Sequence, residues 1–161
     1  MPDNSLSMAD VSSLSRERDR RQFSDYVGLH ATNRRFIPRD EETALLKQAI
    51  SDFGMDRDQA QGVLYAIADE KDIRLESQAE RNVRAFLAHK SPKQKVMRKH
   101  FREAAVMYRN LLNEALTLKE ARQRVKGIMI REGMRPRRIR LLFLPLPIPG
   151  ARRWYNRIRA V

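Results

Sequence analysis

Cysteine is absent from this chain of 161 residues, which excludes disulfides, thiolate metal ligands and a thiol nucleophile. The six glycines are scattered, so the sequence holds no glycine-rich phosphate loop, and no serine lies in a Gly-x-Ser-x-Gly elbow. None of the three histidines has a carboxylate or a second histidine at the spacing of a zinc site. We therefore expect no enzymatic activity, no cofactor and no bound metal.

One acidic cluster is the remaining candidate for a cation site. It consists of Asp69, Glu70, Asp72, Glu76 and Glu80. A calcium loop needs alternating acids around a central glycine, whereas a lysine occupies the middle of this cluster. We expect these carboxylates to be solvated or paired within the fold.

Long apolar runs are also absent. No window reaches the ~18 apolar residues of a membrane-spanning helix, and the N-terminal residues lack the basic and apolar segments of a secretory signal. The run at residues 141–149 contains three prolines, each of which removes a backbone donor. We therefore expect a cytoplasmic protein.

Charge is abundant and unevenly distributed. The net charge is +13, and it divides into +2 for residues 1–39, −7 for residues 40–80 and +18 for residues 81–161. A basic half of this kind is attracted to polyanions such as nucleic acid, an acidic protein or an anionic bilayer.

Five segments combine a helix start signal with apolar residues at helical spacing. They run from Asp40 to Gly54, Asp56 to Asp69, Ser77 to Leu87, Ser91 to Leu116 and Thr117 to Gly133. The sequence shows no repeat of fixed period and no flanked strand pattern apart from the short run at residues 139–144. We predict an all-α fold, a compact and partly orthogonal bundle of about five helices at residues 39–134. A flexible arm (1–38) precedes it, and an extended basic and apolar tail (135–161) follows.

The segment from Ser91 to Leu116 is the expected centre of this bundle. Ser91 and Pro92 resemble a cap and a first helical residue. The predicted inward stripe is Met97, Phe101, Ala104, Tyr108, Leu111 and Ala115, and the opposite flank carries Lys95, Arg98, Lys99, Arg102 and Arg109. One helix would thus offer an apolar seam to the bundle and a cationic face to solvent.

Three interpretations of the tail stay open at this point. Its apolar run could fold back over the bundle as a strap. It could instead enter a membrane interface, with Trp154 and Tyr155 at headgroup depth and arginines on anionic lipid. Alternatively, the arginines could bind nucleic acid phosphates while the two aromatic rings stack on bases.

The last predicted helix also permits a helix-turn-helix interpretation. The turn before it is short, and Lys119, Arg122, Gln123 and Lys126 would share one exposed flank. Such side chains can reach base edges or phosphates in a major groove.

From these patterns we expect a non-enzymatic interaction or adaptor protein. Its basic half and tail would dock on an acidic protein partner or an anionic membrane surface, in the latter case at the inner face of a membrane. The alternative is a DNA-binding accessory protein. The residues expected to bind the anionic partner are Lys95, Arg98, Lys99, Arg102, Arg109, Lys119, Arg122, Lys126, Arg135, Arg137, Arg138, Arg140, Arg152, Arg153, Arg157 and Arg159. Those expected to dock apolar or aromatic groups are Leu142, Phe143, Leu146, Ile148, Trp154 and Tyr155.

Overall fold

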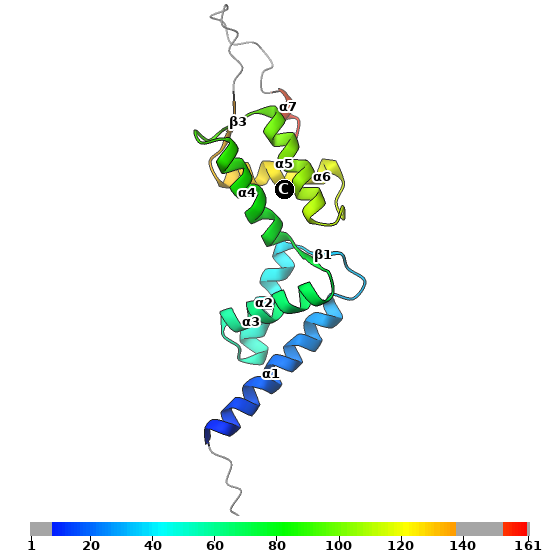
Figure 1. Cartoon of the computed structure of the whole chain (residues 1–161), viewed down its shortest axis with the longest axis vertical. Coiled ribbons are helices and arrows are strands. Elements are labelled where there is room, and N and C mark those ends of the chain that lie inside the picture. The colour runs from blue at the N-terminus through cyan, green and yellow to red at the C-terminus, as the bar shows by residue number, and fades with distance from the viewer. Residues whose placement is uncertain (1–7, 138–152, 161) are drawn as a thin grey trace, which may run out of the picture. The chain divides into compact units, whose positions relative to one another are not determined.

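The computed structural model describes residues 8–137 and 153–160 (Figure 1). These residues form seven helices and four strands of two residues each, so the all-α prediction is confirmed. Contacts within the chain divide it into two units, unit 1 ending at Leu75 and unit 2 beginning at Glu76. The bundle domain predicted at residues 39–134 therefore contains the boundary between the two units.

Unit 1 consists of three helices and one short ladder. Its elements are α1 (Met8–His30), β1 (Phe36–Ile37), α2 (Arg39–Phe53), α3 (Arg57–Glu70) and β2 (Arg74–Leu75). The two strands pair in parallel, with Ile37 opposite Leu75. Residues 8–30, expected to belong to a flexible arm, are helical because Phe23 and Val27 lie one turn apart and are fully buried in the core of this unit.

Unit 2 repeats this order of elements. It consists of α4 (Glu76–Lys90), β3 (Lys95–Val96), α5 (Arg98–Leu111), α6 (Leu118–Arg131) and β4 (Arg135–Pro136), followed by the short helix α7 (Arg153–Asn156). β3 and β4 again pair in parallel, with Val96 opposite Pro136. Helices α4, α5 and α6 pack on one another.

The same positions are buried in both units, 59–61 residues apart along the chain. The buried pairs are Phe23/Val83, Val27/Leu87, Ala31/Ser91, Ile37/Val96, Leu45/Ala104, Ala49/Tyr108, Ala60/Ala121, Leu64/Val125, Ile67/Ile128, Ala68/Met129, Ile73/Met134 and Leu75/Pro136. The prediction that the chain lacks a repeat is therefore wrong at the level of structure. Only two of these pairs are identical residues, so the repeat conserves the burial pattern and leaves little trace of sequence identity.

Several predicted helix ends are confirmed. Each of them is determined by residues that lie close together in the sequence. The Asp56 side chain accepts a hydrogen bond from the amide of Gln59 at 2.8 Å and caps α3. Thr117 and Glu120 form a capping box at the start of α6. Gly54 adopts the left-handed conformation, with φ 59°, that ends α2.

The predicted start of the central helix is wrong. Residues 91–97 form a turn and strand β3, and α5 begins only at Arg98 after Met97. The helix start signal at Ser91 is overridden because Val96 pairs with β4, and this pairing requires an extended backbone. Ser77 likewise lies inside α4, which begins at Glu76 directly after β2.

A buried polar network occupies the core of unit 2. The Tyr108 hydroxyl donates a hydrogen bond of 2.6 Å to Oε1 of Glu76, and both side chains are fully buried. The Arg124 Nε lies 3.3 Å from the same oxygen. Burial, and then the hydrogen bond to Glu76, raise the pKa of Tyr108 well above its usual range. Two members of the acidic cluster, Glu76 and Glu80, thus pair within unit 2, the latter with Arg131.

We predict that Tyr108→Phe lowers the free energy of unfolding by about 1.5–3 kcal/mol, because the buried Glu76 carboxylate loses a donor. Tyr26→Phe is the matched control, since this half-buried hydroxyl donates to the neutral amide of Gln48 and its loss should cost only about 0.5–1.5 kcal/mol. Urea denaturation followed by circular dichroism measures both. Equal losses of unfolding free energy in the two variants would show that the buried Glu76 carboxylate does not need the hydrogen bond from Tyr108.

Candidate anion-binding surface

The ladder between β3 and β4 places two cations side by side. Lys95 lies directly opposite Arg135, and both side chains are exposed, while the next pair, Val96 and Pro136, is buried. Residues in register on paired strands point to the same face, and neighbouring strands lie about 4.8 Å apart. The two charged side chains therefore leave the ladder together on its solvent face.

Arg137 extends this cationic face by one more step. Its amide donates to the carbonyl of Val96 at 2.8 Å, which continues the ladder beyond β4. Side chains alternate along a strand, so Arg137 lies on the same face as Arg135. Its Nη1 lies 3.6 Å from the sulfur of Met97, the residue two positions after Lys95.

The start of α5 adds two more cations. Met97 precedes the helix and provides no side-chain cap, and the exposed Arg98 and Lys99 occupy the first turn. Positive charge is unfavourable at this end of a helix, where the unpaired amides and the helix dipole favour anions. By contrast, the first turn of α2 carries three acids. We name the five side chains Lys95, Arg98, Lys99, Arg135 and Arg137 the cationic patch.

Five of the six acidic residues of unit 2 are engaged elsewhere, and the sixth, Glu103, is exposed on α5. Ion pairs join Glu76 to Arg124, Glu80 to Arg131, Glu114 to Arg109 and Glu132 to Arg84. Hydrogen bonds from the Thr117 side chain and amide lower the pKa of Glu120 and hold it in the capping box. The cationic patch has no ion pair with any carboxylate in the part of the chain that the structure describes.

The equivalent ladder of unit 1 is neutralised. There Phe36 stands opposite Arg74, and Arg74 forms an ion pair of 2.8 Å with Asp72. Asp72 and its counterpart Gly133 both have positive φ and lie two residues before a strand. Unit 2 therefore has a second cation where unit 1 has Phe36, and a glycine where unit 1 has the neutralising carboxylate. The fold itself does not require the charge.

The other predicted cations are divided between solvent and internal contacts. Arg102, Lys119, Arg157 and Arg159 are exposed, and Arg122 is half-exposed. Arg109 pairs with Glu114 at 3.1 Å. The predicted site residues outside the described residues are Arg138, Arg140, Leu142, Phe143, Leu146, Ile148 and Arg152, and the side chain of Arg153 is likewise not described.

The C-terminal aromatic residues contact the helices of unit 2. Trp154 and Tyr155 are half-buried, and the Trp154 ring centroid lies 5.1 Å from that of Phe101 in α5. Lys126 of α6 donates to the Tyr155 carbonyl at 3.1 Å and to the Ile158 carbonyl, and its Nζ lies 4.6 Å from the centre of the Tyr155 ring. Partial burial raises the pKa of Tyr155. The flank of α6 predicted to face DNA is therefore partly occupied by the chain itself.

The sequence predicted these cations but missed their juxtaposition. Lys95 and Arg135 are 40 positions apart, and strands of two residues carry no visible alternation. One weak signal was available in the sequence. After the turn that follows α4 and after the turn that follows α6, a cation (Lys95 or Arg135) precedes a residue that is buried (Val96 or Pro136).

Comparison of the chain with protein-family models, curated proteins and solved structures gives no match. Among the described residues, no helix has the length and apolar character needed to cross a bilayer. Nor does this part of the chain bring together three or more side chains suited to holding a metal ion.

Trp154 is the only tryptophan of the chain and therefore reports on the C-terminal contact. We predict that Lys126→Met shifts its fluorescence emission to longer wavelength and increases quenching by iodide, because two carbonyls of the docked segment lose their donor. Lys119→Met on the exposed side of the same helix is the control and should leave the emission unchanged. An unchanged spectrum in Lys126→Met would contradict the contact.

Proposed function

We propose that this chain is a non-enzymatic interaction protein whose cationic patch docks on an anionic surface, either an acidic protein partner or an anionic membrane at its cytoplasmic face. The observation that carries the proposal is the pairing of Lys95 with Arg135 on the ladder of unit 2. Like charges directly opposite one another destabilise a pair of strands. The arrangement therefore lowers the stability of the free protein and is relieved when an anion lies between the two side chains.

The start of α5 supports the same proposal. Arg98 and Lys99 lie at the positive end of the helix dipole, and each lowers the stability of the free protein by about 0.3–1 kcal/mol. A carboxylate or phosphate bound there would pair with both cations and accept hydrogen bonds from the free amides of the first turn. Two independent unfavourable features of unit 2 would then be offset by one class of ligand.

Nucleic acid remains the second candidate, because phosphates would satisfy the same patch. The structure adds little support for the finer version of that hypothesis. Lys126 is bound to backbone carbonyls, and Trp154 packs against Phe101 in place of being free to stack on bases.

We predict that Lys95→Glu stabilises the protein while weakening its function. Replacing the like-charge pair by an ion pair with Arg135 should raise the free energy of unfolding by about 0.2–1 kcal/mol. The same variant should bind polyglutamate and phosphatidylserine vesicles more weakly at low salt. Lys119→Glu makes the same change of charge at another exposed lysine of unit 2, and binding should stay near that of the unmodified chain. Equal losses in the two variants would show that only net charge matters.

A comparison of three polyanions identifies the class of partner. We expect saturable binding to polyglutamate or to phosphatidylserine vesicles at ~50 mM salt. Duplex DNA serves as the third probe, and a logarithmic salt dependence with a slope of about −0.9 per neutralised phosphate would favour the nucleic acid alternative. Binding to none of the three at this salt concentration would end the proposal.

A further inference from the structure

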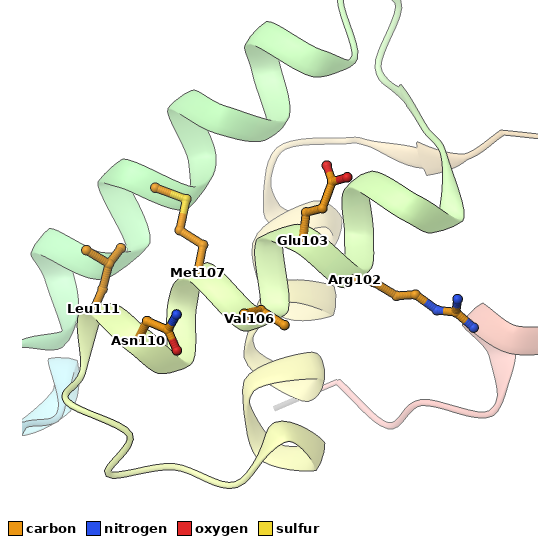
Figure 2. A pocket seen from close by; sticks show the side chains of 6 residues that line it. All are labelled: Arg102, Glu103, Val106, Met107, Asn110 and Leu111. Atoms are coloured by element: carbon orange, nitrogen blue, oxygen red, sulfur yellow. The ribbon is translucent and has the colours of Figure 1, made fainter.

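The surface of α5 carries a shallow, open groove that the cationic patch does not include. Its volume is about 680 Å³, and the lining residues are Arg102, Glu103, Val106, Met107, Asn110 and Leu111, all from α5 (Figure 2). Val106 is 45% exposed, which is high for a large apolar side chain, and Met107 and Leu111 are only half-buried. The floor of the groove is therefore apolar.

Helical spacing joins this groove to the cationic patch. Residues four apart lie on one row along a helix. One row contains Arg98, Arg102, Val106 and Asn110, and the neighbouring row contains Lys99, Glu103, Met107 and Leu111. The first row runs from two cations to Val106 and the polar Asn110, whereas the second runs from Lys99 through the acidic Glu103 to two apolar residues. Cations thus concentrate at the start of α5 and apolar side chains in its C-terminal half, with one carboxylate, Glu103, between them.

Comparison of the two units shows that the fold does not require this apolar floor. The residues of α2 equivalent to Val106, Met107 and Leu111 are Lys47, Gln48 and Asp52, which lie 59 positions earlier. Unit 1 folds with polar side chains there, two of them exposed. The apolar side chains at these three positions of α5 are therefore specific to unit 2, the unit that also carries the cationic patch.

We infer that the α5 groove receives an acidic amphipathic helix of a partner protein. The inference rests on the proposed function and selects a protein partner over a bilayer. Such a helix would place apolar side chains over Val106, Met107 and Leu111 and carboxylates over Arg98, Lys99 and Arg102. The partly exposed apolar side chains of this surface can pack against those of a bound helix, and the cations at its end fix the direction of that helix.

The probe is a synthetic helical peptide of about 18 residues, with leucines at positions i, i+3, i+4 and i+7 in one half and four glutamates in the other. It is added to the isotope-labelled full chain, and backbone amide shifts are followed. We expect saturable shifts centred on Arg102, Val106 and Met107, with a dissociation constant between about 1 µM and 1 mM. A peptide with lysines in place of the glutamates should bind at least about tenfold more weakly.

Val106→Gln combined with Met107→Gln keeps the charge and the helix propensity of α5 while making the floor polar. We expect this double variant to lose at least about tenfold in peptide affinity. Ile50→Gln is the matched control, because Ile50 is exposed to a similar extent, 47%, on α2 of unit 1. It should bind the peptide like the unmodified chain.

The same variants separate a failure of this inference from a failure of the proposed function. Binding to polyglutamate should survive the double substitution in the groove and be weakened by Lys95→Glu. If the peptide binds the double variant normally, or does not bind the unmodified chain at about 1 mM, the groove is not a helix site, while the proposed function still stands on its own test.

Three further results would assign the groove to another occupant and overturn the inference. The double variant could lose binding to phosphatidylserine vesicles, which would make the groove a membrane contact. It could lose a concentration-dependent self-association of the unmodified chain, which would identify a second copy. It could also shift the Trp154 emission as Lys126→Met does, which would identify the chain's own C-terminal segment.

Discussion

In each unit a parallel ladder pairs the segment before the second helix with the segment after the third helix. The ladder is short, and a few backbone hydrogen bonds hold it. In unit 1 the amide of Arg74 donates to the carbonyl of Arg35 at 3.0 Å, and in unit 2 Arg135 donates to Gln94 at 2.8 Å. Behind each ladder lies a buried side chain, Ile37 or Val96, that joins it to the core. The positions of the outward side chains follow from this pairing.

The two units carry different side chains on equivalent ladders. Unit 1 places Phe36 and an Arg74–Asp72 ion pair on its ladder, so the surface is close to neutral. Unit 2 places Lys95 beside Arg135 and has Gly133 where the carboxylate would stand. Because the backbone and the buried positions are shared, the difference in charge is a property of the side chains alone. A repeat within one chain thus provides its own reference for which surface features the fold requires and which serve another purpose.

The sequence predicted features that depend on residues close together in the chain. The caps at Asp56 and Thr117 and the stop at Gly54 each need only three or four residues, and all three are present in the structure. The helix start at Ser91 failed because the distant pairing of Val96 outweighs a local cap. Helix α1 was missed because only a few of its residues are buried, and the residues that pack against them come from α2 and α3. For the candidate site, the sequence supplied the cations, whereas their adjacency depends on a pairing across 40 positions that no local pattern reveals.

Anion binding by the cationic patch is tested most directly by following the backbone amides of the isotope-labelled chain as a short polyglutamate peptide is added at low salt. We expect the largest shifts at Lys95, Arg98, Arg135 and Arg137, with little change at Phe36 and Arg74 on the equivalent ladder of unit 1. Shifts spread evenly over all basic residues, or centred on α6, would contradict this prediction.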